Sequence, residues 1–233
     1  MKRVMIQEKL KQLQIDVDKI VLGDFDAIGE YTAKKTRDRG TDNYNKIGCF
    51  FRPNYERGIL MYHMIQKLKF ESVLEIGFGR GYSTFCMAKA MCDLNIDGKI
   101  TTVDPSISEE FLNQLTTVFP AEWFGKINFV RATSSDYFKD LGEETFDFIY
   151  IDGDHRYEFV KKDWENTKNR FKTALLFDDY TEDKNIQDIE CSKLIDQIED
   201  YNKELIIGDR RIFFDDRGIP DEKINYGQVL ITR

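Results

Sequence analysis

The stretch that decides the fold is Val73-Leu74-Glu75-Ile76-Gly77-Phe78-Gly79-Arg80-Gly81-Tyr82-Ser83. Its apolar beginning predicts a short buried strand, and the residues from Ser83 to Cys92 have the spacing of a helix. The glycines between them allow the backbone to turn sharply and allow a ligand to approach the main chain without meeting a side chain. The stretch therefore predicts a strand, a tight glycine turn and a helix.

The same alternation of strand and helix continues along the chain. We expect strands at 72–77, 99–104, 127–132, 146–152, 174–179, 204–214 and 226–232, and helices at 57–68, 83–92, 109–119, 156–171 and 185–201. Short apolar strands that alternate with longer helices are typical of βαβ units around a buried parallel sheet. The expected fold is α/β, a three-layer, Rossmann-like, doubly wound sheet that is mostly parallel, with an antiparallel strand in a C-terminal hairpin.

The N-terminal part of the chain has a different pattern. Residues 3–14 place Ile6, Leu10 and Leu13 at helical spacing, which predicts a short amphipathic helix. Residues 23–56 are interrupted by glycines and a proline and are rich in aromatic residues. We therefore expect an N-terminal helix with a loop-rich cap at 1–56 and the main domain at 57–233.

Composition excludes several classes of partner. The chain has 233 residues, with 34 Lys plus Arg against 42 Asp plus Glu and a net charge of −8. Because nucleic-acid-binding surfaces are usually basic, no nucleic acid partner is expected. The longest apolar runs are too short to cross a bilayer and the N-terminus lacks the apolar core of a secretory signal, so no membrane partner is expected. Four cysteines without a C-x-x-C pair indicate a reducing, cytoplasmic setting, and the aromatic-rich N-terminal region is a candidate surface for a homo-oligomer.

The spacing of the glycines indicates which ligand the turn accepts. A dinucleotide site has the pattern G-x-G-x-x-G, whereas this turn reads G-x-G-x-G with Glu75 two residues ahead. A carboxylate beside the turn disfavours a diphosphate and favours a cationic ligand. The next predicted strand ends at Asp104, where a carboxylate can accept hydrogen bonds from two ribose hydroxyls. An ordinary strand–helix turn without a ligand is the alternative.

This E-x-G-x-G-x-G pattern with an acidic strand end resembles the cofactor site of class I S-adenosylmethionine-dependent methyltransferases. The resemblance implies that Glu75 and the turn hold the aminoacyl end of the cofactor and that Asp104 holds its ribose. It also implies an adenine contact in the loop after the third strand. The cofactor-binding residues expected on this basis are Glu75, Gly77, Gly79, Gly81, Tyr82, Ser83, Asp104, Ser134, Ser135 and Asp152.

Two further predicted strand ends are rich in aspartate. One reads Ile151-Asp152-Gly153-Asp154-His155 and the other Phe177-Asp178-Asp179-Tyr180. Because the carboxyl ends of parallel strands lie at one edge of a sheet, we expect these carboxylates to converge. Carboxylates held together repel one another unless a cation lies among them, and oxygen ligands favour Mg²⁺ over Zn²⁺. A hydrogen-bonded strand end without metal is the alternative.

The segment IDGDHRYEFVKKDW followed by LLFDDY is similar to the macrocin-type sugar and small-molecule O-methyltransferases. The resemblance implies that Asp152, Asp178 and Asp179 are metal ligands, that Asp152 also takes part in catalysis, and that His155 is the general base. A chemical argument supports His155 as well, because a hydroxyl is a weak nucleophile near pH 7 and histidine titrates near that pH. A surface histidine at the start of the next helix is the alternative.

These observations together predict an S-adenosylmethionine-dependent O-methyltransferase. Its expected acceptor is a hydroxyl of a small molecule (a sugar, a glycoside or a diol or catechol-like compound), and its expected cofactors are S-adenosylmethionine and Mg²⁺. The alternatives are a methyltransferase of RNA or protein that uses no metal, and a cofactor-binding module without catalytic activity.

Overall fold

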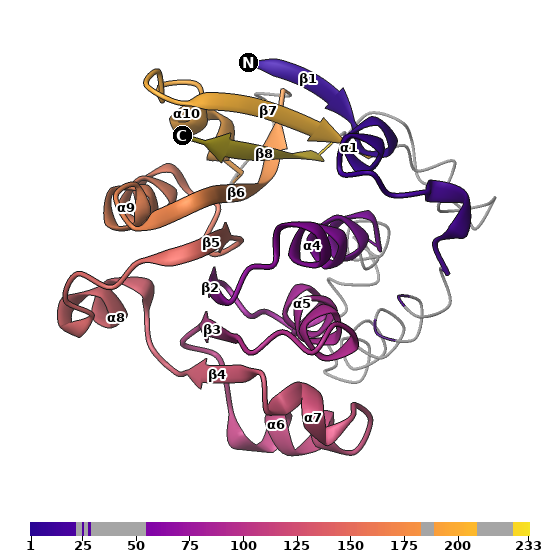
Figure 1. Ribbon diagram of the computed structural model, residues 1–233. Coiled ribbons are helices and arrows are strands. Elements are labelled where there is room, and N and C mark those ends of the chain that lie inside the picture. Colours follow the sequence, from indigo (N-terminus) through magenta and orange to yellow (C-terminus); the bar gives the residue numbers. More distant parts are fainter. Residues whose placement is uncertain (22–24, 26–27, 29–54, 183–188, 209–225) are drawn as a thin grey trace, which may run out of the picture.

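A computed structural model describes residues 1–21, 25, 28, 55–182, 189–208 and 226–233 (Figure 1). The strands in this part of the chain form one sheet of eight strands, with the order β1-β7-β8-β6-β5-β2-β3-β4. Their bounds are β1 (Lys2–Met5), β2 (Ser72–Ile76), β3 (Lys99–Val103), β4 (Ile127–Val130), β5 (Phe146–Ile151), β6 (Phe171–Thr181), β7 (Asn202–Ile207) and β8 (Tyr226–Thr232).

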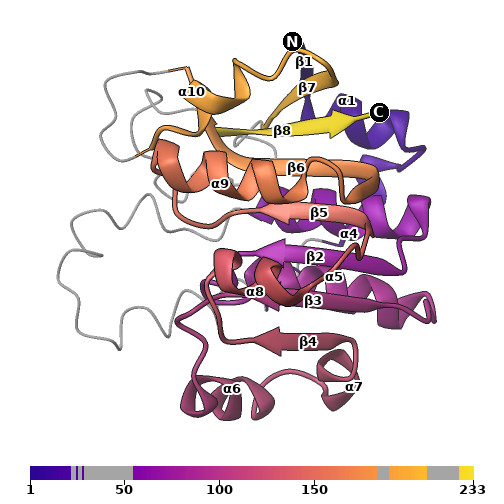
Figure 2. The same ribbon diagram turned by 90° about the vertical axis from the view of Figure 1, so that its left-hand side faces the viewer.

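The five neighbouring strands β6, β5, β2, β3 and β4 all run parallel to one another. Only β8 runs in the opposite direction within the described sheet: it pairs antiparallel with both β6 and β7, as its reversed arrow in Figure 2 shows. The predicted fold class, a mostly parallel sheet with an antiparallel C-terminal strand, is therefore confirmed.

Helices cover both faces of the sheet. Figure 1 shows α1, α4 and α5 on one face and α8 and α9 on the other, so that the molecule has three layers. The helical segments are α1 (Ile6–Gln12), a 3₁₀ turn η1 (Val17–Lys19), α4 (Tyr55–Leu68), α5 (Tyr82–Asp93), α6 (Glu109–Thr116), α7 (Ala121–Phe124), α8 (Ser134–Asp140), α9 (Tyr157–Thr167) and α10 (Cys191–Ile195).

The apolar core consists of two clusters, one on each face. Strand β5 contributes to both because successive side chains of a strand point to opposite faces. Phe148 and Tyr150 lie in the cluster beneath α4 and α5, whereas Ile149 and Ile151 pack with Trp164 of α9. This burial on both sides explains why β5 is a nearly continuous apolar run in the sequence.

The predicted N-terminal helix at 3–14 is wrong in its first part. Residues 2–5 form β1, which pairs in parallel with β7 from Glu204 to Ile207, and only residues 6–12 are helical. The backbone groups at the edge of β7 provide hydrogen-bonding partners, which favour an extended conformation for residues 2–5. The helical spacing of Ile6, Leu10 and Leu13 carries no information about this distant strand.

Three helical regions also differ from the prediction. Helix α8 was not predicted; it begins after Thr133, whose side chain accepts a hydrogen bond from the Asp136 amide as an N-cap. The predicted helix 109–119 ends at Thr116, and α7 follows it. The predicted helix 185–201 is shorter, with α10 at Cys191–Ile195.

The cap predicted over residues 23–56 and the connection at 209–225 lie outside the described residues, apart from Phe25, Ile28 and the start of α4. The boundary predicted between 1–56 and 57–233 stays a prediction. None of the helices that the structure describes combines the length and the apolar composition needed to cross a membrane.

Candidate active site

The glycine turn joins β2 to α5 at the carboxyl edge of the sheet. Gly77 and Gly81 have φ angles of 97° and 86°, which lie in the left-handed region that favours glycine. A Cβ atom at Gly77 would lie 2.0 Å from the carbonyl oxygen of Asp152. The turn therefore lies in close backbone contact with the loop after β5, and the two form one continuous surface.

Glu75 anchors this turn from beneath. Its side chain is completely buried, and its two carboxylate oxygens accept hydrogen bonds from the hydroxyls of Ser83 and Thr84 in the first turn of α5. Burial raises the pKa of Glu75 to about 7, although the two hydroxyls act in the opposite direction. In this structure Glu75 and Ser83 bind each other, and their predicted contact with a cofactor stays a prediction.

Asp104 lies beside the turn, immediately after β3. Its Oδ2 accepts a hydrogen bond from the Gly79 amide at 2.9 Å, and its Oδ1 accepts one from the Ser106 amide at 2.7 Å. These bonds fix the carboxylate next to the turn, as the prediction of a shared ligand site requires.

The loop after β4 reaches the site through α8 and α9. Ser134 and Ser135 form the first turn of α8. The Ser134 hydroxyl donates a hydrogen bond to Oδ1 of Asp163, a buried residue of α9, at 2.5 Å. A Cβ at Gly153 would lie 3.5 Å from Oδ2 of the same carboxylate. Asp163 therefore connects the loop after β4 with the loop after β5.

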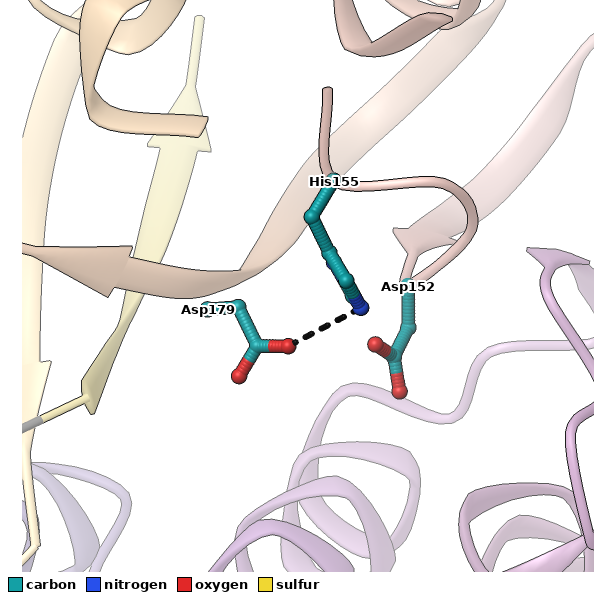
Figure 3. Close-up of side chains that lie close together, drawn as sticks. All are labelled: Asp152, His155 and Asp179. Atoms are coloured by element: carbon teal, nitrogen blue, oxygen red, sulfur yellow. Dashed lines mark ion pairs between the residues drawn. The ribbon is translucent and has the colours of Figure 1, made fainter. Parts of the chain in front are cut away.

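Asp152, His155 and Asp179 form a group with ligand atoms that all lie within 4.8 Å of one another (Figure 3). Asp152 follows β5, His155 lies three residues later, and Asp179 lies in β6 with a φ angle of 51°. Nε2 of His155 is 3.3 Å from Oδ2 of Asp179. The two predicted strand ends are thus brought together.

Asp178 has a different environment from its neighbour. Its Oδ1 accepts a hydrogen bond from the Asp179 amide, and its Oδ2 lies 2.6 Å from the Tyr150 hydroxyl and 2.5 Å from Nη1 of Arg57. Both oxygens are therefore bound within the protein, and the group described above contains His155 where Asp178 was expected. The predicted role of Asp178 as a metal ligand stays a prediction.

Arg57, from the first turns of α4, bridges the two adjacent aspartates. Its Nη2 lies 2.6 Å from Oδ1 of Asp179, while its Nη1 contacts Asp178. The guanidinium thus supplies one positive charge to three neighbouring carboxylates: Asp152, Asp178 and Asp179.

The carboxylates respond differently to this arrangement. Burial, followed by repulsion from Asp178 and Asp179, raises the pKa of Asp152 well above its usual range. Burial acts in the same direction on Asp179, but attraction from Arg57 and His155 outweighs it and lowers the pKa of Asp179. The cluster therefore keeps an excess of acidic groups despite Arg57.

The sequence patterns predict no role for Arg57, Tyr150 or Asp163. A detectable signal existed for Arg57, a charged residue just ahead of the mainly apolar stretch 59–65. One also existed for Asp163, which lies at helical spacing from Val160 and Trp164 and shares their buried face of α9. Tyr150 lies within the apolar run FDFIYI and offered no such signal.

Part of the chain that forms this site is similar to a known protein family. Residues 74–180, which include the glycine turn, Asp104 and the aspartate pair, match the family model of a methyltransferase domain. This chain contains a methyltransferase domain. No curated protein matches the sequence significantly.

Solved structures share the fold of this methyltransferase domain. The O-methyltransferase TomG from Streptomyces achromogenes, involved in tomaymycin synthesis and solved in complex with SAM, has a TM-score of 0.55 at 15% identity over 77% of this chain and 80% of its own. An O-methyltransferase from Bacillus cereus, solved with SAH, has a TM-score of 0.54 at 17% identity over 76% and 80%. A putative O-methyltransferase from Klebsiella pneumoniae has a TM-score of 0.53 at 17% identity over 76% and 79%.

The family match confirms the prediction of a methyltransferase domain over residues 74–180, and the solved structures share its fold. They do not assign individual residues, so the roles predicted for the cofactor turn, for His155 and for the aspartates stay predictions. The same holds for a cytoplasmic location, a homo-oligomer and the absence of nucleic acid and membrane partners.

Proposed function

We propose that this methyltransferase transfers the methyl group of S-adenosylmethionine to a hydroxyl oxygen of a small molecule, with assistance from Mg²⁺. The observation that carries the proposal is the convergence of three features at one edge of the sheet: the glycine turn, Asp104 and the group formed by Asp152, His155 and Asp179. Ligands of open α/β sheets bind at this edge. Two structural neighbours, TomG solved with SAM and the Bacillus cereus enzyme solved with SAH, support the choice of cofactor.

The proposed cofactor lies across the turn. Asp104, which the Gly79 amide orients toward the turn, would accept hydrogen bonds from its ribose hydroxyls. Ser134 and Ser135 would hold its nucleoside, and Asp152, whose backbone lies against Gly77, would hold its sulfonium end.

The donor set of the acidic group fits a hard divalent cation. Asp152 and Asp179 offer carboxylate oxygens whose positions, with His155, lie within 4.8 Å of one another, and oxygen ligands of this kind suit Mg²⁺. We propose Asp152 and Asp179 as the residues that hold Mg²⁺, with His155 beside them. The ion would lower the pKa of an acceptor hydroxyl and orient it.

His155 is the proposed general base. In the proposed reaction the C–S bond of the sulfonium breaks as a C–O bond forms, and the hydroxyl proton passes to Nε2 of His155. The Asp179 carboxylate, 3.3 Å away, stabilises the protonated ring. The main contribution of the protein is alignment of the two reactants.

The acceptor class follows from the cation. A vicinal diol or a catechol-like pair presents two oxygens to one ion, as sugars and glycosides also do, whereas a single hydroxyl has less need of it. The net charge of −8 disfavours an RNA acceptor.

A methyl-transfer assay with radiolabelled S-adenosylmethionine and a panel of diols, catechols and glycosides tests the proposal. We expect transfer to at least one diol-bearing acceptor, a loss of at least about tenfold on chelation of divalent ions, and a similar loss in His155→Ala. Transfer to RNA or protein substrates that chelation does not affect would contradict it. So would S-adenosylhomocysteine binding without transfer to any acceptor, which would indicate a silent cofactor-binding module.

A further inference from the structure

Arg57 occupies a position that a cation at the aspartate pair would otherwise take. Its two terminal nitrogens lie 2.5 and 2.6 Å from oxygens of Asp178 and Asp179. The Asp178 side chain is completely buried, and the Arg57 side chain is only 19% exposed. Buried charge-assisted contacts of this kind are strong because little water screens them.

The contacts divide the aspartate oxygens into two sets. Both oxygens of Asp178 and Oδ1 of Asp179 are engaged by Arg57, by Tyr150 or by the backbone. Oδ2 of Asp179 faces His155 and Asp152 instead. Among the described residues, the group that can hold an ion accordingly contains Asp179 but not Asp178.

We propose that Arg57 is an internal counter-ion that limits the affinity of this site for divalent cations, and that a tightly bound ion gains Asp178 as a ligand only when Arg57 withdraws. This inference rests on the metal site of the proposed function. Two forms of the site follow from it: one in which Arg57 bridges Asp178 and Asp179, and one in which the ion replaces the guanidinium.

The chain makes such an exchange feasible without a change of fold. Arg57 lies near the start of α4 and has a long, flexible side chain, so its guanidinium can leave while the helix stays in place. Asp178 and Asp179 both lie in β6, and Asp178 also accepts a hydrogen bond from the Tyr150 hydroxyl, so their positions do not depend on Arg57 alone. Arg57 is thus a positioning residue that sets ion affinity and does not touch the reacting atoms.

Calorimetric titration of Mg²⁺ into the full chain tests the exchange. Arg57→Met keeps much of the side-chain length and removes the charge, so we expect it to bind Mg²⁺ about tenfold or more tightly than the wild type. The matched control is Arg156→Met, which removes the same charge from an exposed pair with Asp154 next to His155. We expect the control to stay within about threefold of the wild type, since exposed pairs are well screened.

A second variant keeps the test decisive if Arg57→Met does not fold. Arg57→Lys retains a cation but loses the two-nitrogen contact, and we expect it to bind Mg²⁺ about threefold or more tightly than the wild type. In a thermal melt, Mg²⁺ should raise the melting temperature of either Arg57 variant more than that of the wild type. Equal or weaker Mg²⁺ binding in the Arg57 variants, or an equal gain in Arg156→Met, would overturn the inference.

The titrations are performed with and without S-adenosylhomocysteine, so that the two proposals can fail separately. A wild-type chain that binds S-adenosylhomocysteine while the Arg57 variants show no gain in Mg²⁺ affinity contradicts only the exchange. A wild-type chain that does not bind S-adenosylhomocysteine contradicts the proposed function, and the cofactor-free Mg²⁺ titrations still decide the role of Arg57.

Discussion

At the scale of single residues, the site depends on backbone conformations that only certain residues adopt. Gly77 is the clearest case because its positive φ and its contact with the Asp152 carbonyl act together. Gly79 also has a positive φ, but a Cβ there would meet no atom within 4 Å. A substitution at Gly79 therefore tests the cost of backbone strain alone, whereas one at Gly77 tests strain together with a steric clash.

We expect Gly77→Ala to lower the free energy of unfolding by about 2–4 kcal/mol, since left-handed strain adds to a clash with backbone. Gly79→Ala should cost about 1 kcal/mol from strain alone. Urea denaturation of both variants measures the difference, and S-adenosylhomocysteine titration should show weaker binding in Gly77→Ala. Equal stability of the two variants would show that contact between the turn and the Asp152 loop has no energetic role.

Glu75 predicts a dependence of stability on pH. Its pKa is about 7 in the folded protein, against about 4.5 for an ordinary glutamate, because burial disfavours the charged form. The stability that Glu75 contributes is thus fully present below pH 4.5 and is lost as the pH rises through 7. Relative to Glu75→Gln, the wild type should lose about 3 kcal/mol between these limits.

Urea denaturation of the wild type and Glu75→Gln at a series of pH values measures this difference, and the contributions of the other carboxylates cancel between the two proteins. A stability difference that does not change with pH would mean that Glu75 remains ionised when buried.

At the scale of elements, loops at the ends of β2, β3, β4 and β5 assemble the proposed cofactor site, and α9 supports two of them through Asp163. Its hydrogen bond to Ser134 and its proximity to Gly153 hold the loops after β4 and β5 in place. Asp163 does this from beneath the site and is buried.

Asp163→Ala should therefore weaken S-adenosylhomocysteine binding by about tenfold, the equivalent of one lost hydrogen bond, with a smaller change in kcat than in KM for the cofactor. The amide oxygen of Asp163→Asn can still accept a hydrogen bond from the Ser134 hydroxyl, so this variant should bind S-adenosylhomocysteine more tightly than Asp163→Ala. Glu165→Ala, on the exposed side of the same helix, is the control. Binding by Asp163→Ala that equals that of the control would contradict this role.

The elements around the site could be predicted because their signals are local. Apolar runs bounded by glycine or aspartate identified β2, β3, β5 and β6, and the parallel arrangement then implied that Asp152 and Asp179 share an edge. The exchange of His155 for Asp178 in the acidic group could not be predicted. It depends on Arg57, which lies 121 residues away from Asp178 in the sequence, and on the buried hydroxyl of Tyr150. The strand β1 was missed for the same reason, because its partner β7 is also remote.

At the scale of the whole molecule, the N-terminal residues belong to the same folded sheet as the methyltransferase domain. Leu10 of α1 is completely buried in the cluster that contains α4 and α5 residues, and β1 covers the edge of β7. The stability of the site thus depends on residues outside the family match at 74–180.

We expect Leu10→Ala to lower the free energy of unfolding by about 3 kcal/mol, as for other buried leucines. Lys11→Ala, on the exposed side of α1, should change it by less than about 0.5 kcal/mol. Chemical denaturation followed by the fluorescence of Trp123 and Trp164, which lie within residues 74–180, measures the free energy of unfolding of both variants. A Leu10→Ala variant as stable as Lys11→Ala would mean that the N-terminal residues fold independently of that domain.

We propose that the glycine turn, Asp104 and the group formed by Asp152, His155 and Asp179 make one site for a sulfonium nucleoside and a divalent cation. A crystal structure with S-adenosylhomocysteine and Mn²⁺, with the ion located by its anomalous scattering, tests it most directly. The account predicts ribose hydroxyls against Asp104 and an anomalous peak beside Asp152 and Asp179. A nucleoside bound away from the turn, or a Mn²⁺ peak remote from these two aspartates, would contradict it.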